Sequence, residues 1–153
     1  NGKEMFEGTR GKWMIDSPSQ RTQIVSRMKN WRAFSDSSPA DGIEVAIRNY
    51  WSADKRISIY VLGDEFTGES IQGALDAVDR INRPDAGGRR RVRIHAIGFP
   101  VGGGMTPFTN IRFSALMRAM CERNDGTFVG LTNVKTCAAT VEIMGTRQCM
   151  GGD

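Results

Sequence analysis

Two carboxylates and a hydroxyl follow directly after an apolar run in the segment ISIYVLGDEFTG, residues 57–68. The apolar run is typical of a buried strand, and Asp64, Glu65 and Thr67 belong to the loop that follows it. Loops at the carboxyl ends of parallel strands form the functional edge of an open α/β sheet. We therefore expect these three side chains to lie at such an edge.

Two further hydroxyls, Ser37 and Ser38, come just before an expected helix, in the loop 34–41. Because that helix leads back to the far end of the sheet, its first residues should open on the same edge as Asp64. Carboxylate and hydroxyl oxygens suit Mg²⁺ or Ca²⁺ better than zinc. A carboxylate just past a strand also commonly caps the next helix, so Asp64 has a purely structural alternative role.

Other reactive groups are few. His95 is the only histidine and falls in the middle of an expected strand, which predicts a core or helix-facing position and excludes most imidazole-based schemes. Gly102, Gly103 and Gly104 follow the same strand; such a triplet either cradles an anion or simply connects two elements. No nucleophile elbow, Walker loop or dinucleotide-binding fingerprint occurs in the sequence.

Length and composition indicate one soluble-type globular domain over residues 1–153, because 39% of the residues are hydrophobic and 25% are charged. No apolar run approaches the ~20 residues that a membrane helix needs, so no membrane span is expected. Much of the net charge of +4 comes from the basic run 89–93, which lacks interleaved aromatics. We interpret it as a solvated loop and do not expect a nucleic-acid partner. Cys121 should be buried, whereas Cys137 and Cys149 would pair only in an oxidising compartment.

Hydrophobic periodicity predicts elements of alternating type. Strands are expected over 57–62, 92–99 and 127–130, and helices from Ser19, after Pro39, from Glu69 or Ser70 to Asn82, and over 110–123. This order predicts parallel βαβ units in an open, doubly wound (Rossmann-like) α/β sheet with helices on both faces. Residues 132–153 are a weakly patterned tail with a short helix or edge strand near 138–144. The expected buried helix positions are Ile24, Met28, Trp31; Ile43, Ile47, Tyr50; Ile71, Leu75, Val78, Asn82; and Phe113, Leu116, Met117, Met120.

Three segments together resemble the C-terminal part of a von Willebrand factor type A domain, and the resemblance covers about residues 34–131. They are RISIYVLGDEFTGESIQGALDAVDRIN, RVRIHAIGFP and FSALMRAMCERNDGTFVGL. In that family a strand ends in an acidic loop, the next strand reads like IHAIGF, and a helix precedes a final strand. The resemblance implies a three-layer α/β/α fold of this type.

The family holds a divalent ion, usually Mg²⁺, through an Asp-x-Ser-x-Ser loop, a threonine in a second loop and an aspartate in a third. Carried over, Asp64 corresponds to the third-loop aspartate and Ser38 to the second-loop hydroxyl, with serine in place of threonine. The first loop has no full counterpart; the nearest segments are 16–20 and 36–40. Ser37, Glu65, Thr67, Gly102 and Gly103 would then line the ligand side of the site.

Two explanations account for the missing first loop. Either an upstream segment of the same protein carries that loop and the strand before it and so completes the sheet, or the domain is divergent and its ion site degenerate. The resemblance implies a protein-binding module, not an enzyme, that engages a partner carboxylate through the metal. The alternatives are a Mg²⁺-dependent α/β enzyme for a phosphorylated or nucleotide ligand, with Gly102–Gly104 as anion cradle, and a metal-free scaffold subunit.

Overall fold

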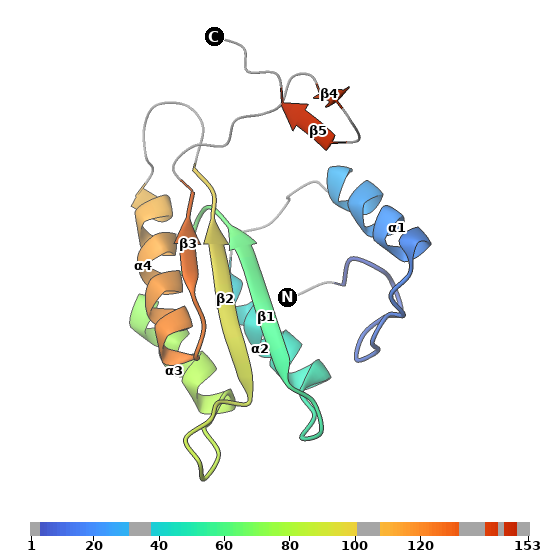
Figure 1. Cartoon of the computed structure of the whole chain (residues 1–153). Helices are drawn as coiled ribbons and strands as arrows, with labels where there is room; N and C mark the ends of the chain where they lie inside the picture. The colour runs from blue at the N-terminus through green and yellow to red at the C-terminus, as the bar shows by residue number, and fades with distance from the viewer. Residues whose placement is uncertain (1–3, 31–37, 101–107, 132–139, 144–145, 150–153) are drawn as a thin grey trace.

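A computed structural model describes residues 4–30, 38–100, 108–131, 140–143 and 146–149. Within them the predicted alternation of strands and helices is confirmed (Figure 1). The elements in chain order are α1 (Pro18–Lys29), α2 (Pro39–Tyr50), β1 (Ile57–Gly63), α3 (Ile71–Ile81), β2 (Val92–Gly98), α4 (Phe108–Arg123), β3 (Phe128–Gly130), β4 (Thr140–Ile143) and β5 (Thr146–Cys149).

The strands β1, β2 and β3 form an open parallel sheet in that order. Ile57 pairs with Val92 and the register runs without a break to Gly63 and Gly98. The β3 strand is shorter and pairs with the second half of β2. The mixed α/β class with an open parallel sheet is therefore as predicted, and β1 is an edge strand among the described strands.

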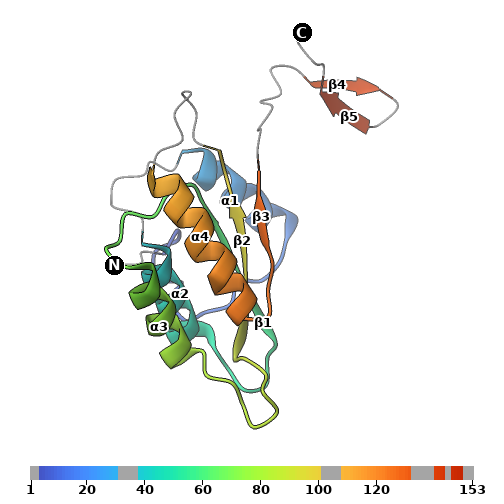
Figure 2. The same ribbon diagram turned by 90° about the vertical axis from the view of Figure 1, so that its left-hand side faces the viewer.

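Helices α2, α3 and α4 cover one face of this sheet (Figure 2). Alternate strand residues point into that layer, as the two-residue period of a strand requires: Ile94 and Ala96 of β2 are 0% and 1% exposed. The predicted helix faces meet them, because Ile43 of α2, Val78 of α3 and Leu116 of α4 are buried. The core thus lies between one helical layer and one sheet face.

The opposite sheet face carries no helix in the described part of the chain, and Figure 1 looks onto it. Tyr60, Leu62 and Val129 project from it with exposed fractions of 64%, 55% and 51%. His95 also lies on this face, stacked on the Tyr60 ring at 5.0 Å between ring centroids, so its predicted core or helix-facing position was wrong. The described residues therefore form two of the three expected layers.

The first helix differs most from its prediction. Ser17, not Ser19, is the N-cap of α1 and its Oγ accepts a hydrogen bond from the Gln20 N–H. The helix has no buried residue, and Met28 is 54% exposed, so the expected core face is not used; Trp31 lies outside the described residues. Instead the segment before the helix contacts α2, where Trp13 packs edge-on against Tyr50.

A buried pair of asparagines holds the amino end of the sheet. The Asn82 Nδ2 donates to the Val92 carbonyl at 2.9 Å and to Asn124 Oδ1 at 2.7 Å, and its Oδ1 accepts from the Val92 N–H. Asn124 donates in turn to the Met120 carbonyl. These bonds satisfy polar groups that would otherwise be costly to bury, and they fasten the ends of α3 and α4 to the start of β2.

Two remaining expectations concern the tail and membranes. Strands β4 and β5 pair as a separate antiparallel hairpin, so the strand alternative for part of 138–144 is correct, although the hairpin does not extend the parallel sheet. Cys121 is buried, which raises the pKa of its thiol to about 11, while Cys137 lies outside the described residues. Within the described residues, every helix is too short or too polar to traverse a bilayer.

Candidate functional site

The start of α4 holds the loop after β1 in place through hydrogen bonds. Asn110 Nδ2 donates to the backbone carbonyl of Asp64 at 2.7 Å and to that of Phe99 at 3.2 Å. One side chain thus joins the loops that follow β1 and β2 at the carboxyl end of the sheet. The Asp64 side chain itself stays exposed.

Phe66 is the anchor of the same loop. Its ring is buried, with 2% exposed, and its N–H donates to the Thr109 carbonyl at 3.1 Å. The Arg112 guanidinium lies over the ring at 5.1 Å and donates to the Glu69 carbonyl at 2.9 Å. The loop therefore has a defined shape, held by a buried ring and backbone hydrogen bonds.

The structural alternative for Asp64 was wrong, because another residue caps the next helix. Ser70 is the N-cap of α3, and its Oγ accepts from the Gly73 N–H at 3.0 Å. Asp64 makes no ion pair with any cation of the described residues. Its carboxylate is thus exposed at the carboxyl end of β1 without a local structural role of that kind.

Ser38 lies at the same end of the sheet, since α2 runs antiparallel to β1 and begins beside the strand's carboxyl end (Figure 1). It occupies the N-cap position of α2, but its hydroxyl makes no capping hydrogen bond. Glu65 is half-buried and Thr67 exposed, both in the loop of Asp64. Ser37, Gly102 and Gly103 lie outside the described residues.

A divalent cation would find part of a ligand set here. Asp64 and Ser38 offer a carboxylate and a hydroxyl, which are the hard oxygen donors that Mg²⁺ and Ca²⁺ prefer. Among the described residues, however, no group of three or more histidine, cysteine, aspartate or glutamate side chains is arranged to hold an ion. The two residues fit the chemistry of the cation, and further ligands would have to come from elsewhere, such as Ser37, water or a partner.

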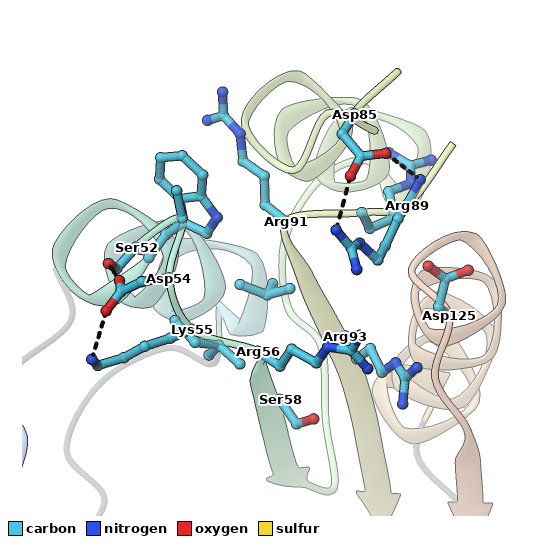
Figure 3. Close-up of a pocket in the computed structure, with 15 residues that line it drawn as sticks. Ser52, Asp54, Lys55, Arg56, Ser58, Asp85, Arg89, Arg91, Arg93 and Asp125 are labelled. Carbon is cyan, nitrogen blue, oxygen red and sulfur yellow. Dashed lines mark hydrogen bonds and ion pairs between the residues drawn. The ribbon is translucent and has the colours of Figure 1, made fainter. Parts of the chain in front are cut away.

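A second region was missed at the sequence level. A cavity of about 400 Å³ opens at the amino end of the sheet, lined by the loop between α2 and β1 and the loop between α3 and β2 (Figure 3). Six of its lining residues are cations: Lys55, Arg56, Arg89, Arg90, Arg91 and Arg93. The sequence contained a signal, because Lys55 and Arg56 precede one strand just as the basic run precedes the next.

No protein-family model, curated protein or solved structure matches the chain.

Proposed function

We propose that the chain is a protein-binding module of the von Willebrand factor A type that engages a partner carboxylate at the carboxyl end of its sheet. The observation that carries this proposal is Asp64. It is an exposed carboxylate on a loop of defined shape, it caps no helix, and it pairs with no described cation.

In this proposal Asp64 and Ser38 hold a Mg²⁺ ion, and an acidic side chain of the partner completes its coordination. The bound ion would supply a positive charge that bridges two carboxylates, which repel each other without it. The Asn110 and Phe66 contacts keep the Asp64 backbone in place, so the loop would lose little conformational entropy on binding.

The metal is tested by titrating the chain with Mn²⁺, a spectroscopically visible substitute for Mg²⁺, for the wild type, Asp64→Asn and Asp125→Asn. Asp125 is the matched control, because it is an exposed aspartate at the opposite end of the sheet. We expect Asp64→Asn to weaken Mn²⁺ binding at least tenfold and Asp125→Asn to leave it unchanged. Equal Mn²⁺ binding by all three proteins would overturn the metal site.

The partner is tested with a phage-displayed random peptide library, selected on the chain in Mg²⁺ and then rebound in EDTA. We expect selected peptides to carry aspartate or glutamate, to dissociate in EDTA and to fail to bind Asp64→Asn. Peptides that bind equally well in EDTA would refute a metal bridge.

A specific observation favours a second candidate, the metal-free scaffold, in which the uncovered sheet face contacts polypeptide. Tyr60, Leu62 and Val129 form exposed apolar surface there, and β1 has a free edge among the described strands. A further strand from an upstream segment of the same protein would pair with this edge and complete the sheet. Selected peptides that still bind in EDTA, and that lose binding in Leu62→Ser but keep it in Val25→Ser on exposed α1, would support this candidate.

A further inference from the structure

The cavity at the amino end of the sheet holds more positive charge than its carboxylates balance. Its lining includes the six cations named above and three aspartates, Asp54, Asp85 and Asp125. Figure 3 shows the basic side chains arriving from both flanking loops and, in the case of Arg93, from the start of β2. What matters is which of these cations already have partners.

Four of the cations are engaged within the protein. Lys55 pairs with Asp54 at 3.2 Å, and Arg89 pairs with Asp85 at 3.4 Å. The Ser52 hydroxyl and Lys55 lower the pKa of Asp54, and the Arg89 and Gly87 backbone N–H groups lower that of Asp85, so both carboxyls are ionised near neutral pH. Within these two pairs the charges offset each other.

Arg90 and Arg91 form hydrogen bonds with carbonyls at the C-terminal end of α3. Arg90 Nη1 donates to the Asn82 carbonyl at 3.0 Å and lies 3.0 Å from Asp79 Oδ1. Arg91 Nη1 donates to the Ile81 carbonyl at 3.1 Å, and its guanidinium lies over the Trp51 ring at 4.7 Å. These contacts satisfy the negative, carbonyl end of the helix.

Arg56 and Arg93 remain. Neither pairs with a carboxylate among the described residues. Ser58 lies opposite Arg93 in the register of β1 and β2, so these two belong to the same side of the sheet. Arg56 directly precedes β1, and Figure 3 shows its side chain beside that of Arg93. Two guanidinium groups therefore project from adjacent strand starts with a hydroxyl beside them, an arrangement that a bound anion stabilises and that like-charge repulsion otherwise disfavours.

We propose that this cavity binds a small ligand carrying two or more phosphate groups, with Arg56 and Arg93 as its main phosphate contacts. Guanidinium groups match phosphate oxygens with paired hydrogen bonds, and the Ser58 hydroxyl can donate another. The cavity volume falls within the range of small-molecule sites, and Trp51, 40% exposed, forms part of its wall. This site lies at the opposite end of the strands from Asp64 and does not depend on the proposed metal.

Binding is tested by titrating the chain with inorganic phosphate, pyrophosphate, adenosine diphosphate and adenosine, followed by calorimetry and tryptophan fluorescence. We expect pyrophosphate and adenosine diphosphate to bind, phosphate to bind at least tenfold more weakly, and adenosine not to bind. Equal affinities for pyrophosphate and adenosine diphosphate would mean that the site recognises the phosphates alone. A higher affinity for adenosine diphosphate would mean that the wall around Trp51 also contacts the nucleoside. No binding of either diphosphate overturns the proposal.

The site is assigned with variants of equal charge. Arg56→Gln/Arg93→Gln should weaken pyrophosphate binding at least tenfold, whereas Lys29→Gln/Arg80→Gln removes the same charge outside the cavity and should leave it unchanged. Trp51→Phe should abolish the fluorescence change while calorimetric binding persists. Equal weakening by both double variants would reduce the effect to net charge and refute the site.

A single-stranded oligonucleotide serves as the last probe. Oligonucleotide binding that is tighter than pyrophosphate binding and is lost in Tyr60→Ala, but not in Arg56→Gln/Arg93→Gln, would place recognition around Tyr60 and not at the two arginines, and would overturn the proposed pocket.

Discussion

The two ends of the parallel sheet are both fastened by asparagine side chains, but in different environments. At the amino end, Asn82 and Asn124 are 0% and 1% exposed and bond to each other and to backbone. At the carboxyl end, Asn110 is only half-buried and bonds to the carbonyls of Asp64 and Phe99. The side chains that fasten the amino end of the sheet are therefore part of the buried core, whereas the one that fastens the carboxyl end lies near the surface.

This difference determines what each end can tolerate. A buried polar group that loses its partner costs the full free energy of its desolvation, whereas an exposed one regains water. We therefore expect the amino end to have fixed geometry and its cavity to be preformed. The carboxyl end should accept changes in its exposed residues, as a surface that binds variable partners would.

The largest expected effect is at Gly126, where the chain passes from α4 toward β3. A Cβ there would lie 1.8 Å from the Ile94 carbonyl oxygen, which is backbone and cannot swing aside. Gly126→Ala should lower the free energy of unfolding by more than about 4 kcal/mol or prevent folding, as measured by urea denaturation.

Gly42→Ala is the matched control. Its Cβ meets nothing within 4 Å on helix α2, and alanine is favoured over glycine in a helix by about 1 kcal/mol. This variant should be slightly more stable than the wild type. A Gly126→Ala protein of wild-type stability would contradict the rigid amino end.

The next effect is expected at the buried asparagine pair. Asn82→Ala removes three hydrogen bonds and leaves Asn124 Oδ1 and the Val92 backbone without their partner, so it should cost about 2–4 kcal/mol of unfolding free energy. Asn49→Ala, whose side chain bonds only to the Val45 carbonyl of its own helix within the described part of the chain, should cost less than about 1 kcal/mol. Similar losses of unfolding free energy in the two variants would show that the asparagine pair is not a main source of stability at the amino end of the sheet.

Sequence alone could predict the elements of this fold because periodicity encodes burial. Ile43 and Ile47 in α2, and Phe113, Leu116 and Met117 in α4, recur at helical spacing and are buried as expected. Periodicity failed for α1, since a spacing that places apolar residues on one side does not say whether another element packs there.

Three-dimensional adjacency was harder to predict than element type. The order of the loops correctly gave Asp64 and Ser38 the same end of the sheet, because that follows from topology. The cavity was missed because its cations come from two loops that are some 30 residues apart in the chain, and each loop by itself is typical of a solvated turn. The structural role of Asn82 was also beyond the sequence, since a helix-ending asparagine does not reveal its partner Asn124.

A moderate effect is expected where the carboxyl end is fastened. Asn110→Ala removes two hydrogen bonds to carbonyls that water can reach, so the unfolding free energy should fall by only about 1 kcal/mol. The change should be local: hydrogen exchange at the Phe66 amide, which donates to Thr109, should quicken while that of the Ile94 amide does not. Equal acceleration at both amides would mean that the two ends open together.

The smallest effect on stability is expected at Asp64, and it separates a functional carboxylate from a structural one. The side chain is exposed and makes no ion pair with the described cations, so Asp64→Asn in EDTA should change the unfolding free energy by less than about 0.5 kcal/mol. Asp79→Asn is the comparison, because Asp79 bridges Arg90 and Arg123 at 3.0 Å each and should cost about 1 kcal/mol. If Asp64→Asn proved the more damaging of the two in urea denaturation, its carboxylate would belong to the scaffold, and a ligand role at the carboxyl end would lose its basis.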